Sequence, residues 1–345
     1  MLRGAIIGLG NVALEGHLPG WLRRDDVTLT AVADVARARR TAAAERLPAA
    51  RWYDAAEELI AREPLDFVDI CTPPSSHGPL IVRALERGLH VLCEKPLVMA
   101  SDELASVLGL VGETGRVVHT VHNWHHAPIV RRSAELVQQG AIGELRHVVW
   151  QTLRLRPAAV RDGQEHNWRL DPALAGGGIL TDHGWHVFYV IRRWIGQHPT
   201  SVVARLETRR HTAWPVEDTA TVQVTFPRAT AEIFLTWAAD RRDNRAELIG
   251  TDGRIELQDD TLVLKRRDGR EQRWACPPAL SNGSVHPDWF EPVAAQFIGE
   301  VVGTLKGEPN LAEASLCAVL ESSARESSRR GGQAITLPAP LVAAW

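Results

Sequence analysis

The sequence predicts two domains: a doubly wound α/β domain, followed by an α+β domain built on a large, mostly antiparallel open sheet. Three observations lead to this fold class. The chain has 345 residues, which is too long for one ordinary hydrophobic core. Its first third alternates continuous apolar strands with helical stretches, which is typical of a parallel sheet covered on both faces. From Ser201 to Ala275, polar and apolar residues instead alternate with period two, as in a sheet with one buried face.

The expected first domain covers residues 1–121. The predicted strands are Ala5–Ile7, Val27–Ala33, Phe67–Cys71, His90–Cys93 and Val117–Val121. The first predicted helix follows the glycine turn and reaches Leu22, and the others span Val35–Arg46, Pro79–Arg87 and Asp102–Glu113. Strands that are joined by helices in this way indicate a parallel sheet.

The expected second domain covers residues 122–345. In chain order we expect a helix at Ile129–Gln139, a strand at Leu145–Leu155, a helix after the triple glycine Gly176–Gly178, consecutive strands over Ser201–Ala275, helices at Asp288–Leu305 and Ala312–Arg325, and a strand at Ala334–Leu337. Turn signals such as Asp252-Gly253 separate the strands. This order favours an α+β domain.

Composition and charge narrow the classes of function. Hydrophobic residues make up 45% of the chain and charged residues 23%, as in a soluble globular protein. The net charge is only -3, with acids and bases interspersed, so we expect no nucleic-acid partner. The apolar runs are strand-length and the N-terminus does not resemble an export signal, so we expect a cytoplasmic protein without membrane contact. The 4 cysteines form no C-x-x-C pair, which agrees with free thiols in a reducing compartment.

A glycine turn follows the first strand. Gly8, Gly10, Asn11, Val12 and Ala13 form a G-x-G-x-x-A pattern directly between a strand and a helix. The first glycine permits the tight turn, the second lets a pyrophosphate approach the backbone, and the alanine lets helix and strand pack closely. The N-terminus of the helix then offers free N–H groups and partial positive charge to phosphates. The pattern favours a dinucleotide-binding turn.

Asp34 strengthens this interpretation. It ends the second strand about 20 residues after the glycines, where a carboxylate accepts hydrogen bonds from the adenosine ribose hydroxyls. The alternative is a helix N-cap, for which aspartate is well suited, and the two roles are compatible. Because the carboxylate repels a 2′-phosphate, we expect NAD as the cofactor, although Arg37 and Arg39 leave NADP open.

A second motif follows the expected strand at His90–Cys93. The chain reads G-L-H-V-L-C-E-K-P-L from Gly88 to Leu97, and an earlier segment reads C-T-P-P-S-S-H from Cys71 to His77. With these motifs the sequence resembles the glucose–fructose oxidoreductase/inositol dehydrogenase/rhizopine-catabolism (Gfo/Idh/MocA) family over nearly the whole chain. The resemblance implies an N-terminal Rossmann domain and an NAD(P)-dependent hydride transfer to or from a sugar-like or cyclitol-like hydroxyl.

The resemblance also assigns residues to the cofactor and to the reacting hydroxyl. It implies that Lys95 contacts this hydroxyl and that Glu94 lies by the nicotinamide ribose, and in relatives the Lys95–Pro96 bond is often cis. It implies that the cofactor's path across the strand ends is lined by Thr72, Pro73 and His77. The position of Lys95 agrees with this role, because ligands of a doubly wound sheet lie outside the carboxyl ends of its strands. Without the motif, a lysine is most often a solvated surface residue.

The second catalytic segment begins at the triple glycine. Asp182 and His186 are four residues apart, so on a helix they share a face. In relatives this pair stands with the lysine around the substrate carbon, whereas an isolated pair of this kind is most often a cap or a surface feature. We expect His186 as the general base, because an imidazole titrates near neutral pH, and Lys95 as a donor to the developing alkoxide. Asp182 would bind a substrate hydroxyl or tune its neighbours by its charge.

Further polar residues are candidates for contacts with the cofactor or the substrate. In similar proteins a pair such as Trp168 and Arg169 approaches either ligand, while a structural ion pair is the alternative for the arginine. Candidate polar contacts with the substrate are His122, Asn123, His125, His126 and His183. Clustered histidines raise the possibility of a metal site. The family chemistry needs no metal and no spacing here is diagnostic, so we expect none.

The sequence departs from the family pattern at two places. Relatives often carry an arginine where His125 or His126 falls, and an acidic residue three positions after the catalytic histidine, where this chain has Tyr189. Both changes bear on substrate contacts or on packing near the site. The substrate is therefore not implied beyond a small polyhydroxylated molecule.

Alternative functions stay open at this point. A reductase of a keto sugar would use the same residues in reverse. A cofactor-binding sensor would keep the fold without turnover, although the complete set of Lys95, Asp182 and His186 argues against it. Glycosidic cleavage through transient oxidation is disfavoured because no metal constellation is convincing. By analogy with relatives, which assemble through the broad sheet, we expect a homodimer or homotetramer.

Overall fold

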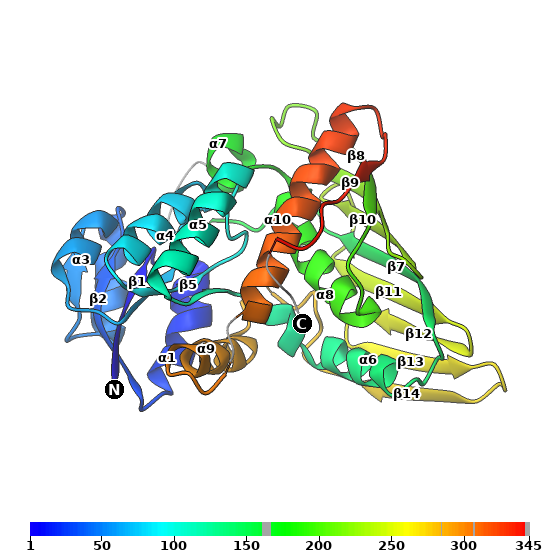
Figure 1. The fold of residues 1–345 in the computed structure, drawn as a ribbon, viewed down its shortest axis with the longest axis horizontal. Coiled ribbons are helices and arrows are strands. Elements are labelled where there is room, and N and C mark those ends of the chain that lie inside the picture. Colours follow the sequence, from blue (N-terminus) through cyan, green and yellow to red (C-terminus); the bar gives the residue numbers. More distant parts are fainter. Residues whose placement is uncertain (161–166, 284, 306–307, 342–345) are drawn as a thin grey trace.

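The chain folds around two sheets that stand side by side, with helices between them (Figure 1). The computed structural model describes residues 1–160, 167–283, 285–305 and 308–341. The predicted fold class is confirmed, because the first sheet is parallel with 6 strands and the second is mostly antiparallel with 9 strands.

The first sheet has the strand order β3-β2-β1-β4-β5-β6, and every neighbouring pair is parallel. Its strands are β1 (Leu2–Ile7), β2 (Val27–Ala33), β3 (Arg51–Tyr53), β4 (Phe67–Ile70), β5 (His90–Cys93) and β6 (Val118–Thr120). The helices between them are α1 (Leu18–Leu22), which continues a π-helical segment at Val12–His17, α2 (Arg40–Arg46), α3 (Ala56–Arg62), α4 (His77–Glu86) and α5 (Ser101–Thr114). The order of strands reverses between β1 and β4, and a cofactor crevice is expected at such a switch point.

The second sheet has the order β14-β13-β12-β11-β7-β10-β9-β8-β15, and only its β7–β10 pair is parallel among the described residues. Its strands are β7 (Leu145–Leu153), β8 (Ser201–Glu207), β9 (Thr219–Thr225), β10 (Thr230–Thr236), β11 (Asp243–Gly250), β12 (Gly253–Gln258), β13 (Thr261–Arg266), β14 (Glu271–Ala275) and β15 (Ile335–Thr336). In β10 the residues Ala231, Ile233 and Leu235 are buried while Glu232 is exposed, so the predicted alternation is confirmed.

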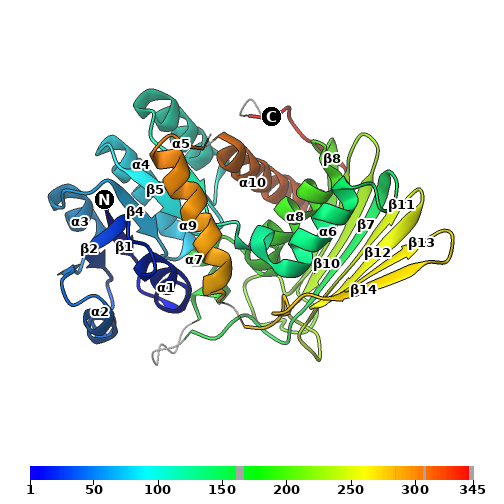
Figure 2. The same cartoon turned by 90° about the horizontal axis from the view of Figure 1, so that it is seen from below.

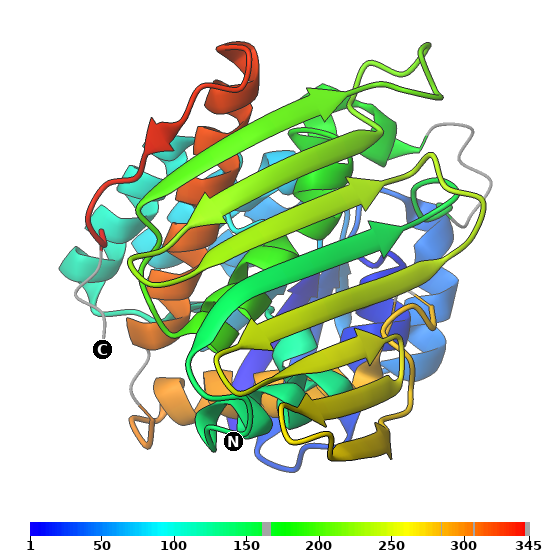
Figure 3. The ribbon, with the colours of Figure 1, turned by 90° about the vertical axis from the view of Figure 1, so that its right-hand side faces the viewer.

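In the part of the chain that the structure describes, helices cover only one face of the second sheet. They are α6 (Pro128–Gln138), α8 (Trp185–Ile195) and α10 (Glu308–Arg329), and the short α7 (Pro172–Ala175) lies nearer the first sheet. Figure 3 shows the opposite face, where the strands lie in front of every helix. The side chains that point inward from β7 to β13 therefore share a core with these helices.

Helix α9 (Pro287–Val301) comes from the second half of the chain but packs against α1 and the π-helical segment of the first half. Phe290 and Phe297 of α9 belong to the same buried cluster as Trp21 and Phe67. Figure 2 shows this helix beside the first sheet. The division between residues 121 and 122 stays a prediction, and the packing of α9 shows that the later chain completes the first core.

Among the labelled helices and strands, β3, α3 and α7 were not expected from the sequence. Strand β3 has 3 residues, all at least partly exposed, so it lacks an apolar run long enough to be recognised. The strands and helices that were predicted from the sequence are present, with ends that differ by a few residues. None of the helices in the described parts of the chain is long and apolar enough to cross a membrane.

Candidate active site

A cleft opens between the carboxyl ends of the first sheet and the helical side of the second. Its walls include Lys95 after β5, Asp182 and His186 from the segment after the triple glycine, and Trp124 after β6. The hollow has a volume of about 1110 Å³, including its open mouth.

The glycine turn has the shape that a dinucleotide requires. Gly8 has φ +87°, and a Cβ at this position would lie 2.9 Å from the backbone of Cys71, so only glycine fits between β1 and β4. A Cβ at Gly10 would have no neighbour within 4 Å, because this α-carbon faces an open hollow. Gly8, Gly10, Asn11 and Val12 line that hollow together with Thr72, Pro73, Trp168 and Arg169. The residues present therefore fit a dinucleotide.

Asp34 lies at the far side of the same hollow. Its carboxylate accepts hydrogen bonds from the N–H groups of Leu9 (2.6 Å) and Ala36 (2.7 Å), and Arg39 donates to it at 2.9 Å. A carboxylate has about four acceptor positions, so one remains for a ribose hydroxyl. Asp34 thus holds the turn in place and lines the hollow. It is not the N-cap that the alternative predicted, because the next helix begins at Arg37 with Ala36 as its N-cap residue and without a side-chain cap.

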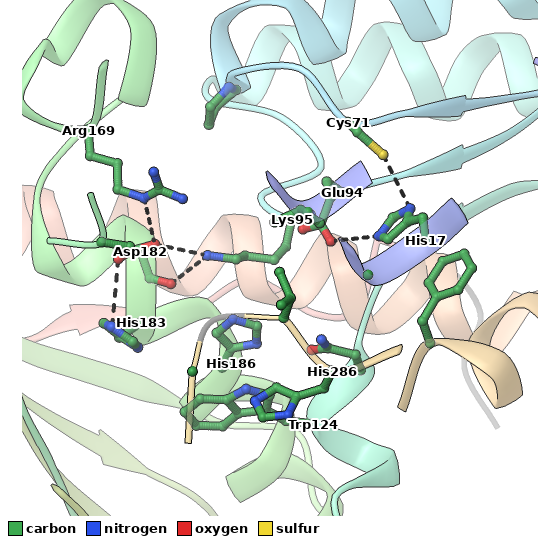
Figure 4. A pocket seen from close by; sticks show the side chains of 18 of the residues that line it. His17, Cys71, Glu94, Lys95, Trp124, Arg169, Asp182, His183, His186 and His286 are labelled. Carbon is green, nitrogen blue, oxygen red and sulfur yellow. Dashed lines mark hydrogen bonds and ion pairs between the residues drawn. The ribbon is translucent and has the colours of Figure 1, made fainter. Parts of the chain in front are cut away.

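Lys95 and Asp182 meet directly, although 87 residues separate them. The Lys95 ammonium donates to the backbone carbonyl oxygen of Asp182 at 2.6 Å and to its Oδ1 at 3.2 Å. Figure 4 shows the two side chains reaching toward each other from opposite walls of the cleft. Burial alone would raise the pKa of Asp182, but Lys95, with a smaller contribution from Arg169, lowers that pKa far below its usual range. The carboxylate is therefore ionised.

His186 lies beneath this pair, stacked on the indole of Trp124 with ring centroids 4.5 Å apart (Figure 4). Its Nδ1 lies 2.7 Å from the hydroxyl oxygen of Tyr189. This oxygen also accepts a hydrogen bond from the backbone N–H of Trp124 at 3.1 Å. Burial, and next the positive charge of Lys95, lower the pKa of His186 well below its ordinary value. The ring is therefore neutral, and it is held by stacking on Trp124 and by the contact with Tyr189.

The triple glycine lets the catalytic segment pack closely. A Cβ at Gly178 would collide with the backbone carbonyl of Glu217, and one at Gly177 would collide with the guanidinium of Arg325. Asp182 follows in a π-helical turn, Leu180–Gly184, which continues directly into α8. Turns of this kind recur at functional sites, because they shift the direction of side chains within a helix.

The remaining candidates divide between the cleft and its surroundings. Asn123, Trp168, Arg169 and His183 line the cleft, and the arginine packs over the indole of Trp168 with its Cζ 4.2 Å from the ring centroid. His183 Nε2 lies 3.6 Å from Asp182 Oδ2. A structural ion pair was the alternative role for Arg169, and its Nε lies 3.8 Å from Asp182 Oδ1, within ion-pair distance.

His77 and His125 do not face the cleft. His77 is 1% exposed, and its two ring nitrogens lie 2.7 Å from the Pro96 carbonyl oxygen and 2.9 Å from that of Thr72. It therefore positions the cis Lys95–Pro96 segment rather than lining the cofactor's path. His125 turns toward α10, where its Nε2 lies 2.8 Å from Glu313 Oε2. Its expected contact with the substrate is not supported by this orientation.

Glu313 is a buried carboxylate that motif reasoning did not find. It accepts from Nδ1 of His122 and from Nε2 of His125, both at 2.8 Å, which is close enough for a shared metal ion. However, Trp185 donates its indole N–H to Nε2 of His122 at 3.1 Å. The neutral His122 ring must then carry its proton on Nδ1, where a metal would bind, so the geometry favours a hydrogen-bonded cluster.

A second network not anticipated from sequence lies behind Glu94. His17 Nδ1 is 2.9 Å from Asp69 Oδ2, and its Nε2 is 3.1 Å from Glu94 Oε1. Burial alone would lower the pKa of His17, but the Asp69 carboxylate outweighs it and raises the pKa well above the usual value. Figure 4 shows the imidazole beside Glu94, at the wall next to Lys95. The protonated ring thus fixes the carboxylate expected near the nicotinamide ribose.

Two family models match the chain. Residues 2–122 match an oxidoreductase family with an NAD-binding Rossmann fold, and residues 130–256 match the GFO/IDH/MocA C-terminal domain. The matched residues include the glycine turn, the E-K-P motif and the catalytic segment after the triple glycine. The resemblance that was inferred from those motifs is confirmed.

Individual relatives are sugar oxidoreductases by name. D-apiose dehydrogenase from Paraburkholderia graminis is 26% identical over 356 residues, which cover 99% of this chain and 92% of that enzyme. dTDP-3,4-didehydro-2,6-dideoxy-alpha-D-glucose 3-reductase from Streptomyces antibioticus is 30% identical over 265 residues, covering 74% and 75%. The aldose-aldose oxidoreductase of Caulobacter crescentus, solved with glycerol, shares the fold with a TM-score of 0.82, at 23% identity over 97% and 99% of the two chains.

Proposed function

Because the chain belongs to the GFO/IDH/MocA family of NAD(P)-dependent oxidoreductases, we propose that it oxidises a hydroxyl of a sugar, sugar derivative or cyclitol, or reduces the matching carbonyl. The observation that carries this proposal is the meeting of Lys95 with Asp182 directly above His186, in a cleft that adjoins the glycine turn. These side chains supply a cation, an anion and a neutral base within one small volume.

Bound nicotinamide supplies the hydride chemistry by accepting the hydride from the substrate carbon in the oxidative direction. The chain's own residues manage the oxygen and the proton. Lys95 donates a hydrogen bond to the hydroxyl oxygen and stabilises the negative charge that develops there. His186 takes the hydroxyl proton on Nε2 while the C–H bond breaks and the C=O bond forms. In the reductive direction His186 returns this proton.

The neighbours of His186 suit it to this role. For Nε2 to accept a proton, the ring hydrogen must sit on Nδ1 and be donated to the oxygen of Tyr189. Tyr189 thus takes the place of the acidic residue that relatives often carry, and it orients the ring without adding a charge. Asp182 holds the Lys95 ammonium in place, and its second oxygen, together with Asn123 and His183, is available to other hydroxyls of the substrate.

Turnover tests this proposal. The purified protein is incubated with NAD⁺ or NADP⁺ and a panel of sugars, sugar acids and inositols, and the absorbance of reduced nicotinamide is followed. We expect turnover with at least one polyol. Cofactor binding without turnover of any member, in either direction with the corresponding keto compounds, would favour the sensor alternative.

Replacing Asp34 tests the choice of cofactor. Asp34 faces the adenosine side and its negative charge opposes a 2′-phosphate, so NAD is the proposed cofactor. In Asp34→Ser we expect kcat/KM for NAD⁺ to fall about tenfold, because a ribose hydrogen bond to a charged acceptor is lost, while use of NADP⁺ improves relative to NAD⁺. The measurement is the ratio of the two kcat/KM values. An unchanged ratio would remove Asp34 from this role.

We also propose that the protein assembles as a homodimer or homotetramer through the uncovered face of the second sheet. Phe234 and Val149 are partly buried on this face although no helix among the described residues covers it. Apolar side chains on the open face of a sheet suit an isologous contact between identical copies.

A further inference from the structure

The cleft carries more positive than negative side chains. Among the described residues, its lining includes five cations, Lys95, Arg154, Arg156, Arg169 and Arg242, and two carboxylates, Glu94 and Asp182. Lys95 and Arg169 both approach Asp182, and Glu94 lies against His17. These two carboxylates are therefore already engaged, and the other arginines have no partner of opposite charge among the described residues that line the cleft.

Arg154 is the most unusual of these cations, because it is only 1% exposed. Its Nη1 donates to the carbonyl oxygens of Leu153 (2.8 Å) and Asp243 (2.9 Å), and its Nη2 donates to Asn244 Oδ1 at 3.1 Å. Its Nε has no hydrogen-bond partner among the described residues. All the acceptors are neutral, whereas a buried charge is normally compensated by an opposite one.

Arg242 is the second cation without a countercharge. Its Nε and Nη2 donate to the carbonyl oxygens of Ser281 and Gly283, and it forms no ion pair with a described residue. Arg241 and Arg245, on either side of it in the sequence, behave differently, because both guanidinium groups lie within ion-pair distance of Asp243. Arg241 and Arg245, which do not line the cleft, thus pair with a carboxylate, whereas Arg242 lines the cleft without such a partner among the described residues.

The acidic groups near the two arginines do not cancel their charge. Asp259 accepts hydrogen bonds from the Asn244 N–H and from the Ser281 hydroxyl, and it forms no ion pair with Arg154 or Arg242. Burial, followed by repulsion from Arg242, lowers the pKa of Arg154 to about 9, and Asp182, Asp259 and Asp243 offset this only in part. Both guanidinium groups line the same cleft, so they repel each other there. An anion between them would relieve this repulsion.

The position of these arginines separates them from the cofactor's phosphates. Arg154 and Arg242 line the cleft that contains Lys95, Asp182 and His186, but neither lines the hollow around Gly8 and Gly10. Arg169 borders both hollows and is the cation placed to approach the cofactor. The pyrophosphate, which belongs at the glycine turn, is thus not the partner of Arg154 or Arg242.

We propose that the substrate carries an oxyanion group, a carboxylate or a phosphate, which Arg242 and Arg154 bind while Lys95 and His186 engage the reacting hydroxyl. The substrate class is a sugar acid or a sugar phosphate rather than a neutral sugar. This inference rests on the proposed oxidoreductase function, because it assigns the rest of the substrate to the same cleft. Planar guanidinium groups match both kinds of oxyanion through paired hydrogen bonds.

Binding to the protein saturated with NADH tests the inference without turnover, because NADH cannot accept a hydride. The probes are D-glucuronate, D-gluconate and D-glucose 6-phosphate, with D-glucose and myo-inositol as neutral counterparts, each titrated by calorimetry. We expect at least one anion to bind about tenfold or more tightly than the neutral compounds, with an affinity that falls as salt is added. Preference for an acid or for the phosphate then identifies the oxyanion.

Two variants and a matched control assign this preference to the arginines. In Arg242→Gln the affinity for the preferred anion should fall about ten- to hundredfold, with little change for the neutral compounds or for NADH. Arg154→Gln should act in the same direction, and if burial prevents it from folding, Arg242→Gln still decides the matter. Arg241→Gln, which removes a neighbouring arginine already paired with Asp243, should leave the anion affinity unchanged.

The two proposals can fail separately. Anion binding that depends on Arg242, without oxidation of any compound, supports this inference and contradicts the oxidoreductase function. Oxidation of neutral polyols with no advantage for their acids or phosphates supports the function and overturns this inference. Equal losses in Arg242→Gln and Arg241→Gln, or equal losses for anions and neutral compounds, also overturn it.

Discussion

At the scale of single residues, the cleft sets the charge of each catalytic group by its surroundings. The sequence alone suggested His186 as the base because imidazole titrates near neutral pH, but the structure places it between Trp124 and the Lys95 ammonium. Burial and the neighbouring cation both favour the neutral ring. His186 is thus ready to accept a proton over a wider pH range than a free imidazole.

The pH dependence of oxidation tests this charge state. Oxidation requires neutral His186, and protonation of the ring stops it. Because the pKa of His186 is lowered, protonation begins only well below pH 6.5, the ordinary pKa of histidine. We therefore predict that kcat/KM stays level as the pH falls from 8 to about 6 and declines only below that range. The measurement is a profile of kcat/KM against pH.

A decline centred at or above the ordinary histidine value would contradict this assignment of the base. Tyr189→Phe provides a comparison, because it removes the oxygen beside Nδ1 but leaves the ring of residue 189 in place. In this variant we expect a lower kcat, since the tautomer with a free Nε2 is no longer favoured.

At the scale of elements, close backbone packing positions the catalytic segment. Gly178 lies against the Glu217 carbonyl, and its own carbonyl accepts the N–H of Asp182 at 3.1 Å. A side chain at residue 178 would push this segment away from the second sheet. Asp182 would then move relative to Lys95, which belongs to the first sheet. The triple glycine therefore links the geometry of both walls.

Gly178→Ala tests this linkage. The added methyl group has no space, so we predict a loss of about 1 to 3 kcal/mol in the free energy of unfolding. We also predict a loss of about a hundredfold in kcat, because Asp182 and Lys95 lose their alignment. Denaturant titration and steady-state kinetics measure the two effects.

Gly112→Ala is the matched control, because Gly112 lies inside α5 and a Cβ there has no neighbour within 4 Å. Alanine is the better helix former, so we expect this control to gain about 0.5 to 1 kcal/mol with unchanged kcat. Equal behaviour of the two variants would show that the packing of Gly178 is not important.

The elements differ in how far the sequence predicts them. Strands β1, β2, β4 and β5 are apolar runs buried on both faces, and such runs are recognisable without knowledge of their neighbours. Strand β3 is an exposed edge strand that owes its conformation to pairing with β2, so its sequence carries little signal. The packing of α9 against α1 likewise depends on contacts between distant parts of the chain.

The candidate site shows the same division. Lys95, Asp182, His186 and the glycine turn stand in local motifs, so they were found from the sequence. Arg154 and Arg242 come together because β7 and β11 pair, with Leu153 opposite Asp243. No local pattern in the sequence indicates that β7 and β11 pair. The only signal was the presence of charged residues at the ends of two expected strands.

The same limit applies to the network behind Glu94. Asp69 and His17 lie on different elements, and the ring of His17 reaches Glu94 only because β4 and β5 are neighbours. A buried charged residue within an apolar strand, such as Asp69 in Phe67–Ile70, was the available sign of a partner.

At the scale of the whole molecule, the two sheets have different surroundings. Helices enclose the first sheet, whereas the second exposes one broad face (Figure 3). Phe234 projects from this face between the buried residues Ile233 and Leu235. The proposed assembly would cover it with a second copy of the chain.

Phe234→Glu tests this assembly. We predict that the native protein is a dimer or tetramer and that the variant, which buries a charge at the contact, weakens association about tenfold or more. Light scattering after size-exclusion chromatography, over a range of concentrations, gives the masses. Val302→Glu, an apolar-to-acidic change on an exposed residue at the end of α9, is the control and should not alter the mass. A monomeric native protein would contradict the proposal.

The two halves of the molecule meet functionally at Lys95, which the first sheet carries and the second half holds through Asp182. The most direct test is the rate of hydride transfer in a single turnover, measured with Lys95→Met and saturating cofactor. We predict a fall of about 10²- to 10³-fold with unchanged cofactor affinity, because one donor to the developing alkoxide is lost. Lys265→Met, whose native ammonium pairs with Glu256 on the second sheet, should keep the native rate. A native rate in Lys95→Met would contradict the central claim.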